Sequence, residues 1–223
     1  AKEIKNLGSS ELEAALQENF LQRNWKKLGV ACAAVVVAIL GVIAWNAWTE
    51  KRNQKAAEAL FPCEQLFQAG NYQKALEGDG ANCVGLLEVV KQYGGCKTGN
   101  VAKLYAGLSY ANLKQFEEAK KYLSDFDTKD DALISPAALG ALGNVYVQLG
   151  ENEKGAETLV KAASKADNSL VSPIFLVQAA QVYESLGNAD KALKLYEQIR
   201  DNYRGSVQGN EVEKYIERIK AGK

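Results

Sequence analysis

The sequence contains no histidine, no methionine, only three prolines and four cysteines, and as many acidic as basic residues, 27 of each. Without histidine the chain has no imidazole to activate a serine or cysteine nucleophile, to bind a metal, or to change charge near neutral pH. A net charge of zero argues against a nucleic-acid-binding protein, which needs a basic face to neutralise phosphates. The composition therefore predicts a protein that is not an enzyme and carries no cofactor, no metal site and no catalytic residues.

Charge is also missing from one long stretch, residues 28–48 (LGVACAAVVVAILGVIAWNAW), in which only Asn46 is strongly polar. As a helix this stretch would rise about 31 Å, which matches the hydrocarbon core of a bilayer. The alternative is a buried helix of a soluble domain, but such helices rarely stay apolar on every face over this length. A cleavable signal peptide fits poorly, because the stretch is too long and lacks a small-residue cleavage site. The sequence predicts one transmembrane helix.

Residues typical of a membrane interface lie at both ends of this stretch. Trp25, Lys26 and Lys27 precede or open it, and Trp45 and Trp48 close it. Indole rings prefer the headgroup level of a bilayer, so these five residues predict contacts with membrane lipid. Three Lys/Arg residues lie near each end, so the positive-inside rule does not decide the orientation.

Residues 1–27 form a short polar tail in which Ser10 and Glu13 make a capping box, the signature of a helix start. Apolar residues follow at helical spacing, which predicts an amphipathic helix lying on the membrane or on a partner; they are Leu12, Leu16 and Phe20. A disordered tail is the alternative, because an isolated helix this short is marginal in water.

The larger C-terminal region contains a repeat, since residues 103–126, 139–162 and 176–199 align without gaps. Tyrosine recurs at offsets of 36 and 37 residues, and so does a small residue nine positions later; these are Tyr110, Tyr146 and Tyr183 with Ala119, Gly155 and Ala192. Each unit predicts a helix, a short turn and a second helix, with the small residue where the two helices cross. This pattern resembles the tetratricopeptide repeat; a helical bundle without repeats is the alternative.

The predicted fold is therefore all-α, a single N-terminal transmembrane helix followed by a tetratricopeptide-repeat-like helical solenoid. Its expected segments are a tail (1–27), the span (28–48), a stalk (49–62) and the repeat domain (63–223), with a degenerate repeat (59–82), an insertion (83–100), three repeats (about 101–126, 137–162 and 174–199) and a capping helix (209–221). Pro62 should kink or end the helix that leaves the span, because proline cannot donate the helical hydrogen bond. It would then act as a joint, or alternatively as the first-turn proline of the next helix.

Four cysteines and two loops were weighed as chemical sites. Cys32 lies in the span, and no pair among Cys63, Cys83 and Cys96 has metal-binding spacing. Cys83 could pair with Cys96 on an oxidising side of the membrane, although free buried thiols are the simpler interpretation. The Gly95–Thr98 stretch lacks the glycine spacing of a phosphate loop. The aspartates of residues 125–131 lack the glycine of a calcium loop.

The remaining functional surface is the groove that the first helices of such repeats line, which typically holds an extended peptide or a partner helix. The expected groove residues are Leu104, Leu108, Ala111, Asn112, Asn144, Val147, Val177, Gln181 and Glu184. Leu104 and Val177 occupy positions where a carboxylate clamp would need lysine, which disfavours a co-chaperone of that type.

The whole layout, and stretches such as GDGANCVGLLEVVKQYGGCKTGN and SPIFLVQAAQVYESLGNADKALKLYEQI, resemble the bacterial YfgM-type proteins in their Bacteroidota version. The resemblance implies an inner-membrane protein with its tail in the cytoplasm and its repeats in the periplasm. It further implies an accessory subunit of the Sec translocon that binds SecYEG and the membrane-anchored periplasmic chaperone PpiD and assists newly exported proteins. The alternatives are a scaffold for another cell-envelope assembly and an enzyme, for which no constellation of residues exists.

Overall fold

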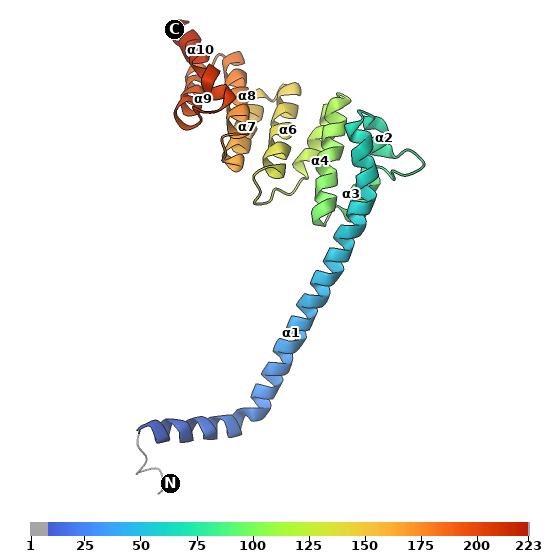
Figure 1. The fold of residues 1–223 in the computed structure, drawn as a ribbon, viewed down its shortest axis with the longest axis vertical. Coiled ribbons are helices and arrows are strands. Elements are labelled where there is room, and N and C mark those ends of the chain that lie inside the picture. Colours follow the sequence, from blue (N-terminus) through green and yellow to red (C-terminus); the bar gives the residue numbers. More distant parts are fainter. Residues whose placement is uncertain (1–8, 223) are drawn as a thin grey trace. The chain divides into compact units, whose positions relative to one another are not determined.

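The computed structural model describes the backbone of residues 9–222 and the side chains of residues 24–222. All the regular elements in this part of the chain are α-helices, which confirms the predicted fold class (Figure 1). Their bounds are α1 Ser9–Gln68, α2 Tyr72–Glu77, α3 Leu86–Tyr93, α4 Lys97–Asn112, α5 Phe116–Ser124, α6 Ile134–Gln148, α7 Asn152–Ala166, α8 Ser172–Ser185, α9 Ala189–Asn202 and α10 Val207–Ala221. The chain divides after Lys51 into an N-terminal unit and a second unit, called the repeat domain below.

The N-terminal unit contains most of the long helix α1. Within the described residues α1 is the one helix long and apolar enough to cross a membrane, and none of its apolar window is buried by other parts of the chain. Side chains such as Val37 and Leu40 are more than half exposed, as lipid-facing side chains of a single span would be. The chain is helical from Ser9, but the apolar stripe predicted for the tail lies on side chains outside the described residues.

Pro62 does not end α1, contrary to the prediction, since the helix runs through it to Gln68. Leu60 and Cys63, on either side of the proline, are 4% and 0% exposed and belong to the first hydrophobic core cluster of the repeat domain. Tertiary packing on both sides therefore holds the helix together, even though the proline donates no hydrogen bond.

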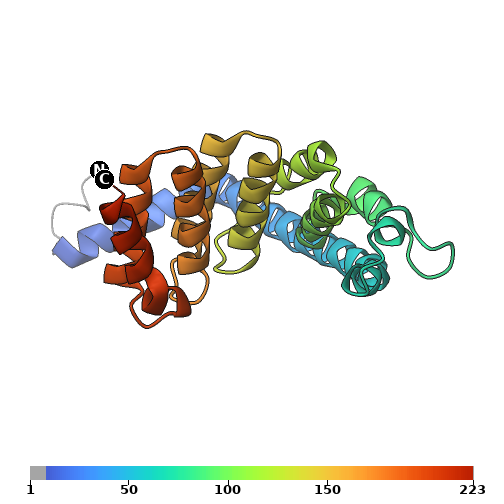
Figure 2. The same ribbon diagram turned by 90° about the horizontal axis from the view of Figure 1, so that it is seen from above.

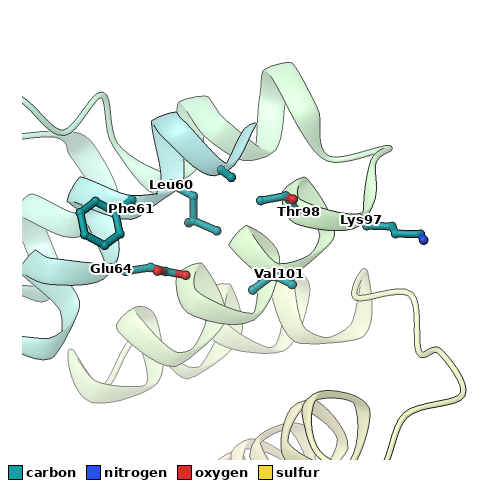
Figure 3. A pocket seen from close by; sticks show the side chains of 7 residues that line it. Leu60, Phe61, Glu64, Lys97, Thr98 and Val101 are labelled. Atoms are coloured by element: carbon teal, nitrogen blue, oxygen red, sulfur yellow. The ribbon is translucent and has the colours of Figure 1, made fainter. Parts of the chain in front are cut away.

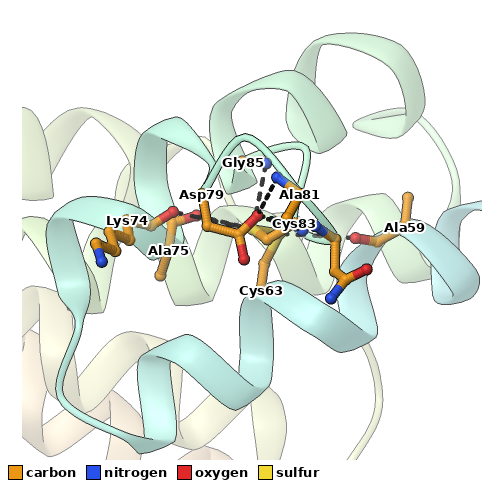
Figure 4. The surroundings of a disulfide bond; sticks show 9 residues. Ala59, Cys63, Lys74, Ala75, Asp79, Ala81, Cys83 and Gly85 are labelled. Carbon is orange, nitrogen blue, oxygen red and sulfur yellow. Dashed lines mark hydrogen bonds between the residues drawn. A yellow bond between two sulfur atoms is a disulfide. The ribbon is translucent and has the colours of Figure 1, made fainter.

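The end of α1 is the first helix of the first helical pair, whose second helix is split into α2 and α3. Residues 78–85 loop out between them, and Gly78 and Gly85 have φ of 100° and 95°, a backbone conformation that favours glycine. The carboxylate of Asp79 accepts hydrogen bonds of 2.9 Å from the backbone N–H groups of Ala81, Asn82 and Cys83 (Figure 4).

A disulfide bond fastens this loop to α1. It joins Cys63 to Cys83, with the Cα atoms 5.1 Å apart (Figure 4). The Cys83–Cys96 pairing considered from the sequence is therefore wrong. Cys96 is a buried free thiol, and its Sγ accepts a hydrogen bond from the N–H of Gly99 at the start of α4.

The helices that follow pair as α4 with α5, α6 with α7, and α8 with α9, and α10 packs on the last pair. Figure 2 shows these pairs side by side in chain order. The turns within the last two pairs use Gly150 and Gly187 at positive φ, and Lys114 takes the same conformation in the first. Helices α6 and α7 cross closely, because a Cβ atom on Gly143 would lie 3.1 Å from the carbonyl oxygen of Gly155.

The loops between repeats also recur. Asp131 accepts hydrogen bonds from the N–H groups that open α6, and Asn168 accepts them from Leu170 and Val171 just before α8. Ser135 and Ser172 follow four residues later, are fully buried and bond back to the loop backbone. These loops fix where each first helix starts, and so determine which of its side chains line the concave side of the repeats.

Candidate functional site

The main candidate site is an apolar hollow of about 390 Å³ between the first helices of three successive pairs, α4, α6 and α8. Its lining residues are Leu108, Ala111, Phe116, Ala137, Gly140, Ala141, Asn144, Val145, Gln148 and Phe175. None of these ten side chains titrates in the ordinary pH range. The hollow can therefore receive an apolar group and orient it by two amides, but it offers no acid, base or nucleophile.

The hollow exists because small residues on α6 leave space between larger ones on its neighbours. Gly140 carries no Cβ, and the ring of Phe175 on α8 fills the place that a Cβ would take. Phe175 thus forms one wall, and Leu108 on α4 lies on the other side of α6. The polar edge is supplied by Asn144 and Gln148, which are both exposed.

Three of the nine groove residues expected from the sequence, Leu108, Ala111 and Asn144, line this hollow. Leu104 does not, because it is 6% exposed and packs in the core that α4 shares with α5 and α6. The expectation that Leu104 is open to a ligand is therefore wrong. Val147 contacts the Gly155 position of α7, within its own repeat.

The remaining expected groove residues lie elsewhere on the first helices. Asn112 is exposed, and its amide donates a hydrogen bond of 2.8 Å to the carbonyl of Leu108. Val177 packs partly against the C-terminal core, and Gln181 is exposed. Glu184 is bonded to Tyr196 and Arg218 and so holds the C-terminal helices together.

The sequence analysis missed several lining residues on α6, although a signal for them was present. Starting from Asn144, the positions three, four and seven residues back and four residues ahead fall on the same helical face; they are Ala141, Gly140, Ala137 and Gln148. Phe175 gave no such signal, because it reaches the hollow from the next repeat.

A second hollow, of about 340 Å³, lies between the repeat-domain part of α1 and the start of α4 (Figure 3). Phe61 and Leu60 give it an apolar side, and Glu64 and Lys97 give it charge. Burial raises the pKa of the Glu64 carboxyl, and a hydrogen bond with Tyr105 acts in the opposite direction. Phe61 is 59% exposed, so this end of the first helices also presents an apolar ring to solvent.

No metal centre is formed by the part of the chain that the structure describes, which contains no group of three His, Cys, Asp or Glu side chains placed to share an ion. The aspartates before α6 have other partners. Asp127 pairs with Lys129, Asp130 with Lys165, and Asp131 caps α6.

The residues predicted to meet membrane lipid are exposed, as such a role requires. Trp25, Trp45 and Trp48 are 65%, 66% and 53% exposed. The rings of Trp45 and Trp48 lie 5.4 Å apart, and the Lys26 ammonium lies 5.9 Å from the Trp25 ring centre. Lys27 is exposed as well. Their contact with lipid stays a prediction.

Comparison with known proteins supports the repeat assignment. A family model described as a tetratricopeptide repeat-like domain matches residues 18–159, and a tetratricopeptide repeat model matches residues 175–206. Among solved structures, the chain is similar to a Q17M crystal structure of nearly identical TPR-like repeats, described as a kinesin light chain from Podosopora anserina. The two share 15% identity and a TM-score of 0.56 over 75% of this chain and 85% of the other. No curated protein matches the chain.

A likeness at this identity shows the fold alone, but the first family model covers more than half of the sequence. Repeats of this kind stack into solenoids with extended concave surfaces that bind other proteins. The chain belongs to the tetratricopeptide repeat-like domain family.

Proposed function

We propose that this protein is a membrane-anchored accessory subunit of the bacterial Sec translocon, which binds a periplasmic chaperone through its repeats and the SecYEG channel through its span. The observation that carries the proposal is the apolar hollow across α4, α6 and α8 in a chain whose α1 is long and apolar enough to span a membrane. Such a chain holds a protein partner at a membrane surface.

The chemistry of the hollow favours a protein partner. Its walls are Leu, Phe, Val and Ala side chains and its edge carries two amides, a composition that suits one or two apolar side chains of a peptide or helix. The absence of titrating side chains from this lining also gives an enzyme no support.

The disulfide between Cys63 and Cys83 supports a periplasmic repeat domain. Disulfides form and persist in oxidising compartments such as the periplasm and are rare in the cytosol. Because both cysteines lie on the C-terminal side of the span, the tail before it would be cytoplasmic. This argument decides an orientation that the balanced Lys/Arg count left open.

The identity of the partners rests on the resemblance to the YfgM-type layout, from the tail through AWNAW to the last repeat. That resemblance names SecYEG and a PpiD-type membrane-anchored chaperone as partners.

The test is purification of the full chain from crosslinked native membranes in mild detergent. SecYEG subunits and a PpiD-type chaperone should be recovered with the wild-type chain. A matched variant, Ala141→Glu, places a charge in the hollow and should lose the chaperone but keep the channel. Recovery of neither partner would overturn the proposal, and recovery of other envelope proteins would favour a scaffold for a different assembly.

A further inference from the structure

Three exposed apolar side chains recur at a constant interval along the repeat domain. Leu133, Leu170 and Val207 are separated by 37 residues each and are 61%, 75% and 72% exposed. Each lies at or just before the start of a first helix, α6, α8 or α10. We call these three residues the apolar ridge.

The apolar ridge lies on one edge of the repeat domain. Figure 2 shows the loops that lead into α6, α8 and α10 along one edge, and the turns within the helical pairs along the opposite edge. This arrangement follows from the repeat itself, because each helix–turn–helix unit returns the chain to the edge at which it started.

The chain also enters the repeat domain at this edge. The side chain of Asn53 on α1 accepts a hydrogen bond of 3.3 Å from the N–H of Thr98, in the first turn of α4. Arg52 donates one of 3.0 Å to the carbonyl of Gln92, near the end of α3. The start of α1 in this domain therefore lies beside the start of α4, at the edge where the other first helices begin (Figure 1).

The connection to the span is short. Only residues 49–51 separate Trp48 from Arg52, and this many residues reach at most about 14 Å. A bilayer that holds the span is thus close to the edge that carries the apolar ridge, whatever the angle between the two parts of the chain.

The charges around the apolar ridge are largely neutralised within the loops. Lys129 pairs with Asp127 and Lys165 with Asp130. The Asp131 carboxylate is occupied by the N–H groups of α6. The loops can therefore approach a bilayer without an uncompensated acidic surface, and a contact that would be weak in solution becomes effective when a span tethers it.

We propose that the apolar ridge of Leu133, Leu170 and Val207 rests in the interface of the lipid bilayer and so fixes the tilt of the repeat domain over the membrane. The inference rests on the membrane anchoring in the proposed function. It adds a second lipid contact, made by the loops between repeats.

The test uses the full chain in nanodiscs of phosphatidylethanolamine and phosphatidylglycerol. Spin labels are attached to Leu133→Cys, Leu170→Cys or Val207→Cys in a Cys32→Ser, Cys96→Ser background that keeps the disulfide. Collision rates with oxygen, which concentrates in lipid, and with a water-soluble nickel chelate are compared for each label. The matched control is Leu186→Cys, an exposed leucine at the turn on the opposite edge, and Val37→Cys reports on the span.

The labels on the apolar ridge should show a several-fold loss of nickel collisions and a gain of oxygen collisions in nanodiscs, while the label at residue 186 stays water-exposed. Equal water exposure at all four repeat-domain sites, with residue 37 in lipid, would overturn the ridge proposal and leave the anchoring intact. A water-exposed label at residue 37 would instead overturn the anchoring. Protection of the apolar ridge that persists in detergent without a bilayer would show that protein covers it, and would overturn the lipid contact.

Discussion

The hydroxyl of Tyr196 donates a hydrogen bond of 2.6 Å to the carboxylate of Glu184. Arg218 donates to both oxygens of the same carboxylate, at 2.9 Å and 2.6 Å. Tyr196 is fully buried, and its ring stacks on Tyr215 at 5.1 Å. One carboxylate on α8 therefore joins α9 and α10, and this network closes the C-terminal end of the solenoid.

The first prediction concerns alkaline pH. Burial, with the hydrogen bond to Glu184, raises the pKa of Tyr196. Because the folded pKa lies above the unfolded value of about 10, this stabilisation is fully present below that pH and is lost as the pH rises above it. Tyr196→Phe should lower the unfolding free energy by about 1.5 kcal/mol at pH 7, and the difference from wild type should shrink above pH 10. Urea unfolding at both pH values measures it.

The control is Tyr122→Phe, which removes a hydroxyl from α5 far along the chain and should show no such change between the two pH values. A difference between Tyr196→Phe and wild type that stays constant at high pH would contradict the assigned network.

The second prediction concerns the disulfide. Its loop spans 20 residues, and closing a loop of about this length stabilises a fold by about 3 kcal/mol. The double substitution Cys63→Ser, Cys83→Ser should therefore lower the melting temperature of the repeat domain and remove its sensitivity to reductant. Thermal unfolding with and without dithiothreitol measures both effects. Cys96→Ser should keep the reductant sensitivity, and a peptide map that joined Cys83 to Cys96 would refute the pairing.

The disulfide also shows where sequence reasoning stops. Which cysteine meets Cys83 depends on how residues 78–85 fold back, and this depends on two glycines at positive φ and on the Asp79 carboxylate. A pattern of residue types does not fix such a non-local approach. The same limit applies to Pro62, where packing of Leu60 and Cys63 maintains a helix that local propensity would end.

The repeat core, in contrast, could be predicted because its signals are local and periodic. Tyr146, Tyr183 and Ala192 are 7%, 6% and 0% exposed, as their recurrence predicted. The groove was predicted less well, because exposure along a first helix depends on the neighbouring repeat. Leu104 and Leu108 lie one turn apart, yet α5 and α6 cover the first and leave the second in the hollow.

The third prediction concerns the close crossing of α6 and α7. In an open helix, replacing glycine by alanine would stabilise the protein by about 1 kcal/mol. At Gly143 the added Cβ would lie 2.8 Å from Leu159 Cγ and 3.1 Å from the carbonyl oxygen of Gly155. Gly143→Ala should therefore destabilise the repeat domain, by about 1–3 kcal/mol. Gly95→Ala, where no atom lies within 4 Å of the added carbon, is the control for chemical denaturation, and equal stability of both variants would contradict the crossing.

The last prediction separates binding from folding on α4. Leu108 lines the hollow and is half-buried, so Leu108→Glu should reduce partner binding by tenfold or more, about 1.4 kcal/mol, and leave the circular dichroism spectrum unchanged. Leu104 is buried, so Leu104→Glu should unfold the repeats, because it buries an unpaired charge. Leu186→Glu, at an exposed leucine outside the hollow, should change neither. Binding of the purified full-length variants to the crosslinked partner, measured by interferometry, tests this, and full affinity in a folded Leu108→Glu protein would show that the partner binds another surface.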